Sequence, residues 1–203
     1  MREHRDGEAP AEPKPSAPRS GALEKHVPHH YKSRFNRFGI DVKFNLIDRI
    51  EQISDDRIVA VKYVSLAEEY LADHFPTFPV LPGVMMLEAL TQAAAWLLHR
   101  RSNFGKSIAV LKEARNVKYG NFVAPGNALR VEVDFFKATE TGAVFKASGM
   151  VRETQALSAR LELSYFNLAE KQPELAVLDQ HLIDHTKARW TALNQGKEQR
   201  IQL

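Results

Sequence analysis

His74 and Glu88 are the residues of this chain whose types and spacing best suit proton transfer. An imidazole can accept a proton near neutral pH and a carboxyl can donate one, so the pair could exchange protons with one substrate. Prolines at positions 76, 79 and 82 lie between them, and they restrict the backbone and disfavour both helix and sheet. We therefore expect His74 to lie in a stiff loop that leads to Glu88.

Gly83 comes just before a helix that we predict from Val84 to about Arg101. The first N–H groups of a helix have no partner inside it and carry the positive end of its dipole. Glycine also lets a substrate approach the backbone closely. With a base and an acid nearby, the Gly83 N–H could polarise a carbonyl oxygen while a proton next to that carbonyl is removed and a hydroxyl leaves.

The predicted helix is apolar almost all around, which is typical of a helix buried on all sides. Its polar residues before the basic end are Glu88, Thr91 and Gln92. Gln92 lies one helical turn beyond Glu88, where its amide can hold the carboxylate in one rotamer. Met85 and Met86 are interpreted as core packing, although an acyl tunnel beside the helix would need the same residue types.

A structural interpretation competes with the catalytic one. A lone histidine near a helix is usually structural, and a lone buried glutamate can be a satisfied core group. The occurrence of His74 and Glu88 together, with Pro82-Gly83 between them and Gln92 beyond, favours the catalytic interpretation.

This segment resembles the signature of the 3-hydroxyacyl-(acyl-carrier-protein) dehydratases of type II fatty-acid synthesis. The matching residues are His74-Phe75-Pro76, Pro79-Val80, Pro82-Gly83-Val84, Glu88-Ala89 and Gln92. The resemblance continues less closely through residues 44–50 and 123–127, and so covers roughly residues 35–168. It implies an α+β hot-dog fold, in which an antiparallel sheet wraps around one long apolar central helix.

The resemblance implies a role for each residue of the motif. His74 would take the α-proton, Glu88 would assist departure of the β-hydroxyl as water, and the Gly83 N–H would polarise the thioester carbonyl. The Val80 carbonyl would orient the His74 ring and Gln92 would support Glu88. The implied partners are the acyl carrier protein that bears the substrate and a second copy of the chain, whose Glu88 meets His74 in a homodimer or a trimer of dimers. No metal and no organic cofactor is implied.

Several positions differ from the family's usual pattern. Glu88 favours the branch that only dehydrates, since the related dehydratase/isomerase enzymes carry Asp there. Asp73 and Thr77 replace common glycines near the histidine. Gly120 and Asn121 stand where the family often has basic residues, so other residues would have to contact an acidic carrier protein. The candidates are Arg100, Arg101, Lys106, Lys112, Arg115 and Lys118.

Two other functions stay open at the level of sequence. One is a non-catalytic hot-dog subunit that binds acyl chains and has lost efficient chemistry through Asp73 and Thr77. The other is an acyl thioesterase, which is less favoured because the His-Phe-Pro segment has no evident part in that reaction.

The pattern of residues 58–64 is typical of a strand. Apolar and polar residues then alternate, as they do in half-buried strands, along residues 107–112, 128–137, 143–152 and 156–166. One long helix with a run of antiparallel strands is an α+β layout. We expect a disordered Pro-rich tail at 1–34, a hot-dog domain at 35–168 and a C-terminal helical extension at 169–203.

Composition excludes several classes of function. The chain has 203 residues, a formal net charge of +3 and no cysteine, which removes disulfides, thiol nucleophiles and cysteine-zinc sites. The mildly basic balance gives little support to nucleic-acid binding. With no apolar stretch long enough for a signal or a membrane span, we expect a cytoplasmic protein. His181 and His185 could share a helix face as metal ligands, but a solvated face is the better interpretation, and His26, His29 and His30 are interpreted as tail residues.

Overall fold

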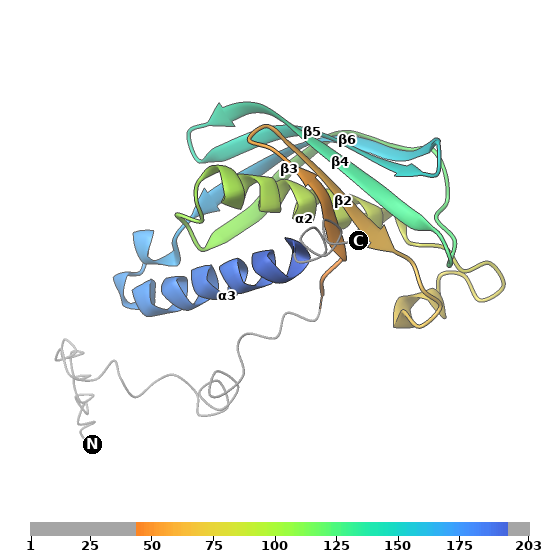
Figure 1. Ribbon diagram of the computed structural model, residues 1–203, viewed down its shortest axis with the longest axis horizontal. Helices are drawn as coiled ribbons and strands as arrows, with labels where there is room; N and C mark the ends of the chain where they lie inside the picture. The colour runs from red at the N-terminus through yellow and green to blue at the C-terminus, as the bar shows by residue number, and fades with distance from the viewer. Residues whose placement is uncertain (1–43, 195–203) are drawn as a thin grey trace, which may run out of the picture. The chain divides into compact units, whose positions relative to one another are not determined.

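One six-stranded antiparallel sheet packs against a long helix, α2 (Figure 1). The computed structural model describes residues 44–194, and the predicted tail at 1–34, with His26, His29 and His30, lies outside them. The strands are β1 (Arg49–Ile53), β2 (Arg57–Tyr63), β3 (Ile108–Tyr119), β4 (Ala128–Thr139), β5 (Gly142–Val151) and β6 (Thr154–Phe166). The helices are α2 (Gly83–Arg101) and α3 (Ala176–Asn194), with short 3-10 turns η2 (Glu69–Leu71), η3 (Leu168–Glu170) and η4 (Pro173–Leu175).

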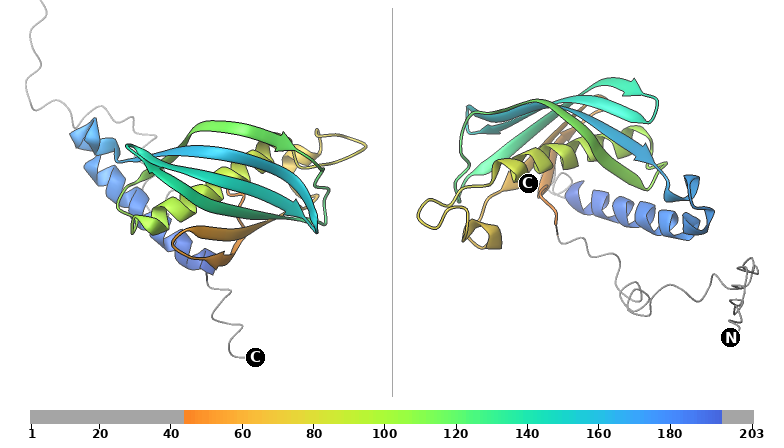
Figure 2. Two further views of the ribbon diagram at one scale, coloured as in Figure 1. Left: turned by 90° about the horizontal axis from the view of Figure 1, so that it is seen from above. Right: turned by 180° about the vertical axis from the view of Figure 1, so that it is seen from behind.

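The sheet curves around α2, which contacts the five strands from β2 to β6 (Figure 2). Alternate residues of each strand face the helix, so Leu129, Val131 and Val133 of β4 are fully buried while their neighbours along the strand are not. Leu90 and Leu97 of α2 are equally buried in the same core. The predicted hot-dog arrangement of one apolar helix inside an antiparallel sheet is therefore confirmed.

The expectation that α2 is buried on all sides is wrong for a single chain. Val84 is 71% exposed in the first turn, and Glu88, Gln92 and Trp96 are half-buried along one side of the helix. The sheet can cover only one face of a helix. The other face of α2 is also apolar, so it is suited to form an interface or to line a cavity.

β3 is longer than its alternating pattern predicted. The pattern ends near Lys112, but the strand continues to Tyr119 along β6. Two irregularities, after Leu111 and after Arg115, each shift the register, and Asn116 has a positive φ of 53°. A bulge breaks the two-residue alternation by which a strand is recognised, so the second half of β3 could not be seen in the sequence.

α3 lies within the predicted C-terminal extension and contacts β1. Its best-buried residues are Asp179 and Leu193, and its other large apolar residues are half-buried or exposed. Within residues 44–194, no helix has the length and apolar character needed to cross a membrane.

Candidate active site

His74 lies in a tight loop between η2 and α2. Its ring Nδ1 is 2.9 Å from the Val80 carbonyl oxygen, and the Val80 N–H donates in return to the His74 carbonyl at 2.9 Å. Phe75 and Phe78 exchange backbone hydrogen bonds of 3.1 and 3.0 Å across the intervening Pro76-Thr77. The proline-restricted loop is thus closed by its own hydrogen bonds, and the bond to the Val80 carbonyl fixes the orientation of the His74 ring.

The partner of Nδ1 determines the tautomer of His74. A carbonyl oxygen can only accept a hydrogen bond, so Nδ1 must carry the hydrogen when the ring is neutral. Among residues 44–194 no group is bonded to Nε2. Nε2 is therefore the free basic nitrogen of the ring. Asp73 is exposed, and no ion pair joins it to His74 within the described part of the chain.

Gly83 is the first residue of α2, and its N–H has no acceptor among the described residues. A Cβ at this position would lie 2.9 Å from Cε1 of Tyr119, so the ring of Tyr119 packs directly against the glycine. His74, Gly83 and Tyr119 line one cavity of about 350 Å³, together with Phe122. A free ring nitrogen and an unpaired N–H thus border the same space.

Glu88 is half-buried on α2, one turn from Gln92. The Gln92 Nε2 donates to the Glu88 carboxylate at 2.9 Å, while its Oε1 accepts from the Leu46 N–H at 2.9 Å. The same Nε2 lies 3.3 Å from the Phe44 carbonyl oxygen. The backbone before β1 therefore orients the amide, and the amide orients the carboxylate.

The structure does not bring all the expected residues into one place. Glu88 and Gln92 line a second cavity, of about 370 Å³, which is separate from the one lined by His74 and Gly83. Within one chain the proposed base and acid therefore border different spaces. A site that uses both would have to combine the His74 cavity of one chain with the Glu88 cavity of another.

His99 is a buried residue of α2 that our sequence analysis did not select. It lines the Glu88 cavity, and burial lowers its pKa to about 4. Its ring stacks on Phe104 and meets Tyr165 edge to face, with the Tyr165 hydroxyl 3.3 Å from Nδ1. His99 is therefore neutral at physiological pH and adds no charge to the cavity.

Comparison with known proteins identifies the family. Residues 41–160 match the FabA-like domain family. The chain belongs to this family. A FabZ 3-hydroxyacyl-(acyl-carrier-protein) dehydratase of Lactococcus lactis subsp. cremoris (strain SK11) is 42% identical over 109 residues, which are 53% of this chain and 75% of that protein. The FabZ dehydratase of Pelotomaculum thermopropionicum is 34% identical over 144 residues, 70% of this chain and 94% of that protein.

A solved structure agrees with the FabA-like assignment at the level of fold. The dehydratase heterocomplex ApeI:P from Xenorhabdus doucetiae aligns with 68% of this chain and 93% of its own, at a TM-score of 0.56 and 18% identity. This similarity supports the hot-dog fold. The family match ends at residue 160, so α3 lies beyond the part of the chain that defines the family.

The basic residues predicted to contact a carrier protein are mostly engaged within the chain. Arg101 pairs with Asp56, Lys106 with Glu170, Lys112 with Glu162 and Arg115 with Glu113. For Arg100 and Lys118, no carboxylate within residues 44–194 lies at ion-pair distance.

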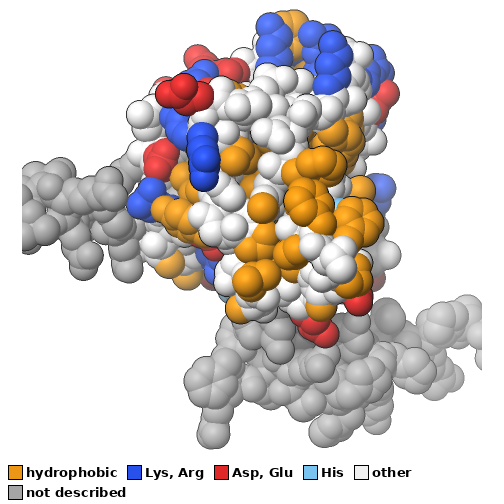
Figure 3. Space-filling model, turned by 90° about the vertical axis from the view of Figure 1, so that its right-hand side faces the viewer, with side chains coloured by type: hydrophobic (Ala, Val, Ile, Leu, Met, Phe, Trp, Pro, Cys, Tyr) orange, Lys and Arg blue, Asp and Glu red, His pale blue; other side chains and the backbone are white. Residues whose placement is uncertain are grey.

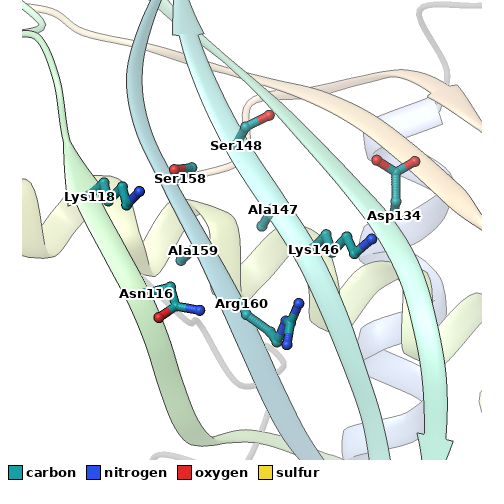
Figure 4. Close-up of a pocket in the computed structure, with 9 residues that line it drawn as sticks. All are labelled: Asn116, Lys118, Asp134, Lys146, Ala147, Ser148, Ser158, Ala159 and Arg160. Carbon is teal, nitrogen blue, oxygen red and sulfur yellow. The ribbon is translucent and has the colours of Figure 1, made fainter.

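Lys118 belongs to a cationic hollow that sequence analysis missed. Figure 4 shows Lys118, Lys146 and Arg160 around this hollow of about 300 Å³, on the face of the sheet opposite α2. Asp134 also lines the hollow and pairs with Arg57. Lys146 lies opposite Asp134 in the register of β4 and β5 and opposite Arg160 in that of β5 and β6, and alternation along one strand cannot reveal such neighbours. In the described part of the chain, none of the three cations has a carboxylate partner at ion-pair distance.

The possible metal ligands His181 and His185 are not joined by a third ligand. Among residues 44–194 there is no group of three His, Cys, Asp or Glu side chains that could hold a metal ion. His181 is exposed, whereas His185 is half-buried and lines the Glu88 cavity.

Proposed function

We propose that this chain catalyses the reversible dehydration of 3-hydroxyacyl-acyl-carrier-protein to the trans-2-enoyl thioester. The observation that carries the proposal is the hydrogen bond from His74 Nδ1 to the Val80 carbonyl, because it leaves Nε2 as the free base in a cavity that Gly83 also lines. Membership of the FabA-like family and similarity to FabZ dehydratases support the same reaction and the same carrier.

The residues divide the reaction between them. His74 Nε2 removes the proton from the carbon next to the thioester carbonyl, and the Gly83 N–H donates to the oxygen on which negative charge develops. The C–O bond at the β-carbon breaks as Glu88, acting as the acid, delivers a proton to the leaving hydroxyl, which departs as water. Proton exchange with solvent then returns the base and the acid to their starting forms, and the same steps in reverse hydrate the enoyl thioester.

We also propose that the site is shared between the two subunits of a homodimer. The cavities of His74 and Glu88 are separate in one chain, and large apolar side chains are exposed around the first of them. Phe75, Phe78 and Phe122 are 51%, 53% and 62% exposed. Figure 3 shows hydrophobic side chains gathered on the face that carries the loop before α2. An exposed apolar patch of this kind is typical of an interface.

The edge of the sheet supports the same assembly. β1 and β3 are the two edge strands, and β1 is short and contacted by α3. β3 has 12 residues and carries the exposed side chains of Val110 and Leu111. A long uncovered edge strand readily pairs with another chain, so β3 is the edge that we expect a second copy to pair with.

The test is hydration of a crotonyl thioester, followed by its absorbance, with wild type, His74→Ala and Glu88→Gln. Each substitution removes one proton-transfer group and should lower kcat by about 10²- to 10⁴-fold. His181→Ala and Glu69→Gln change the same residue types at exposed positions and should keep the wild-type rate.

Other outcomes would favour the other functions. Equal rates in wild type and both site variants would remove the proposed mechanism. Binding of acyl thioesters without turnover by the wild type would indicate a non-catalytic acyl-binding subunit. Release of free thiol from acyl-CoA would indicate a thioesterase.

A further inference from the structure

The Glu88 cavity follows one face of α2. It is lined along the helix by Glu88, Gln92, Ala95, Trp96 and His99. Residues three or four apart share one face of a helix, and the rise of 1.5 Å per residue makes this row about 16 Å long. The dehydration proposed above places the β-carbon of the substrate at Glu88, so the acyl chain beyond that carbon has to continue along this face.

The opposite wall of the cavity comes from α3. His185, Thr186 and Arg189 line it, and they lie beyond the residues that match the FabA-like family. All three side chains are polar, and the Thr186 hydroxyl donates to the Leu182 carbonyl at 2.7 Å, whereas Ala95 and Trp96 across the cavity offer mainly carbon. The lining is therefore polar at Glu88 and Gln92, mainly carbon at Ala95 and Trp96, and polar again at α3.

α3 is held in place by contacts of its own. The buried Asp179 carboxylate accepts the N–H groups of Leu168 and Ala169 at 2.9 and 2.8 Å, and also the hydroxyl of Ser107. Nearer the other end of α3, the Trp190 ring lies 5.9 Å from that of Trp96, between ring centroids. A helix fixed at both ends makes a defined wall.

Arg189 gives this wall a means of rejecting long chains. The residue is half-buried, and no carboxylate within residues 44–194 is at ion-pair distance from its guanidinium. An alkyl chain that reached Arg189 would displace the water around an unpaired charge, which is costly. A chain that ends before α3 would avoid this cost and still bury its carbons against Ala95 and Trp96.

We propose that α3 closes the acyl pocket and sets the longest acyl chain that this enzyme accepts, with Thr186 and Arg189 as specificity-determining residues. This inference rests on the proposed dehydratase function and adds to it a substrate class, 3-hydroxyacyl thioesters whose chain fits between Glu88 and α3. Neither residue touches the reacting atoms, so their substitution should change chain-length preference and leave the chemistry intact.

The experiment measures kcat/KM of the full chain on a carrier-bound 3-hydroxyacyl series of increasing length. Thr186→Trp fills the cavity and should lower kcat/KM for the longest accepted chains by about tenfold or more, with the shortest chain within about twofold of wild type. Thr191→Trp makes the same change at an exposed position of α3 and should leave the series unchanged. Arg189→Leu should raise kcat/KM for chains longer than the wild type accepts.

Two results would overturn the inference. One is a chain-length series that is the same in Thr186→Trp and Thr191→Trp. The other is an Arg189→Leu protein that is folded by circular dichroism and has gained no activity on longer chains. The two variants therefore have opposite expected effects, because Thr186→Trp shortens the cavity and Arg189→Leu removes the charge from its wall.

Failure of the proposed function would be recognised separately. If wild type turns over no substrate of the series, calorimetric binding of the matching 3-hydroxyacyl-pantetheines to wild type, Thr186→Trp and Thr191→Trp decides the inference. Loss of long-chain binding in Thr186→Trp alone would support α3 as the pocket wall even though dehydration had failed. Equal binding in all three proteins would reject the role of α3 as well as the proposed dehydration.

Discussion

Glu88 depends on a chain of hydrogen bonds that begins in the backbone. The Leu46 N–H requires an acceptor, so it fixes which end of the Gln92 amide is oxygen, and the NH₂ end must then face the Glu88 carboxylate. The i, i+4 spacing in the sequence predicted the contact between the two side chains. It could not predict the Leu46 bond, which joins residues far apart in the chain.

Loss of the Gln92 amide should therefore act through Glu88. In Gln92→Leu the carboxylate keeps its place on α2 but loses the donor that fixes its rotamer. We expect kcat to fall by about tenfold or more with little change in KM, because the substrate still binds while the acid is less well placed. Steady-state kinetics on a crotonyl thioester measure both values. Gln180→Leu on α3 is the matched control, and an equal loss there would contradict the prediction.

Gly83 is required for space as well as for its N–H. A methyl group at this position would lie 2.9 Å from Cε1 of Tyr119 and push that ring into the His74 cavity. Gly83→Ala should therefore lower kcat/KM although its N–H is retained. Adding Tyr119→Leu removes the ring and should restore part of the loss, as measured by the same hydration assay. If Gly83→Ala and the double variant are equally impaired, the clash is not the cause.

At the scale of elements, the sequence predicted α2 and the strands that alternate regularly. It missed the second half of β3, because the irregularities after Leu111 and Arg115 break the alternation. It also predicted α3 without a role, since the contacts that matter are tertiary. The Asp179 carboxylate bonds Ser107, which is a distant residue, and the Trp190 ring meets Trp96 of α2.

His99 links the stability of this helical layer to pH. Its pKa is lowered to about 4 by burial, so the folded protein binds no proton there between pH 6.5 and 4, while the unfolded chain does. The contribution of His99 to the free energy of unfolding should therefore be fully present above pH 6.5 and decrease as the pH is lowered towards 4. Since one pKa unit is worth about 1.4 kcal/mol, this residue can account for a loss on the order of 3 kcal/mol.

The prediction can be checked by chemical denaturation at a series of pH values. His99→Phe keeps an aromatic ring against Phe104 but cannot be protonated, so its free energy of unfolding should decline less between pH 6.5 and 4. Hydrogen bonds from Ser107, Ala169 and Leu168 outweigh burial and lower the pKa of Asp179, so its own contribution is lost only at more acid pH. Identical pH dependence in wild type and His99→Phe would exclude His99 as the cause.

At the scale of the whole molecule, the cationic hollow is the surface where we expect the carrier protein of the proposed reaction to dock. Lys118 borders the hollow, and the next residue, Tyr119, lines the His74 cavity on the other side of the sheet. A carrier bound at Lys118, Lys146 and Arg160 would thus lie just across the end of β3 from the proposed base. Of these three cations, the sequence analysis named only Lys118, because Lys146 and Arg160 approach it only through the pairing of β3, β5 and β6.

Reversal of charge at Lys118 should separate docking from chemistry. Lys118→Glu is expected to raise KM for the carrier-bound substrate by about tenfold and to leave the rate on the pantetheine thioester unchanged, since only the former needs the charged surface. Lys171→Glu, at an exposed position near α3, makes the same charge change away from the hollow. Equal effects of the two variants on the carrier-bound substrate would show that net charge, not this surface, is responsible.

The assembly itself can be tested with two inactive proteins. If His74 and Glu88 of different chains form each site, a dimer of one His74→Ala chain and one Glu88→Gln chain contains one site with both wild-type residues. Random exchange of equal amounts should then restore about a quarter of the wild-type activity. If each site lay within one chain, every site in the mixed dimer would lack one residue, and the mixture would stay as inactive as its components. Co-expression of the two variants with different tags, followed by two-step purification, isolates the mixed dimer and should double that value, because every molecule then has one intact site out of two.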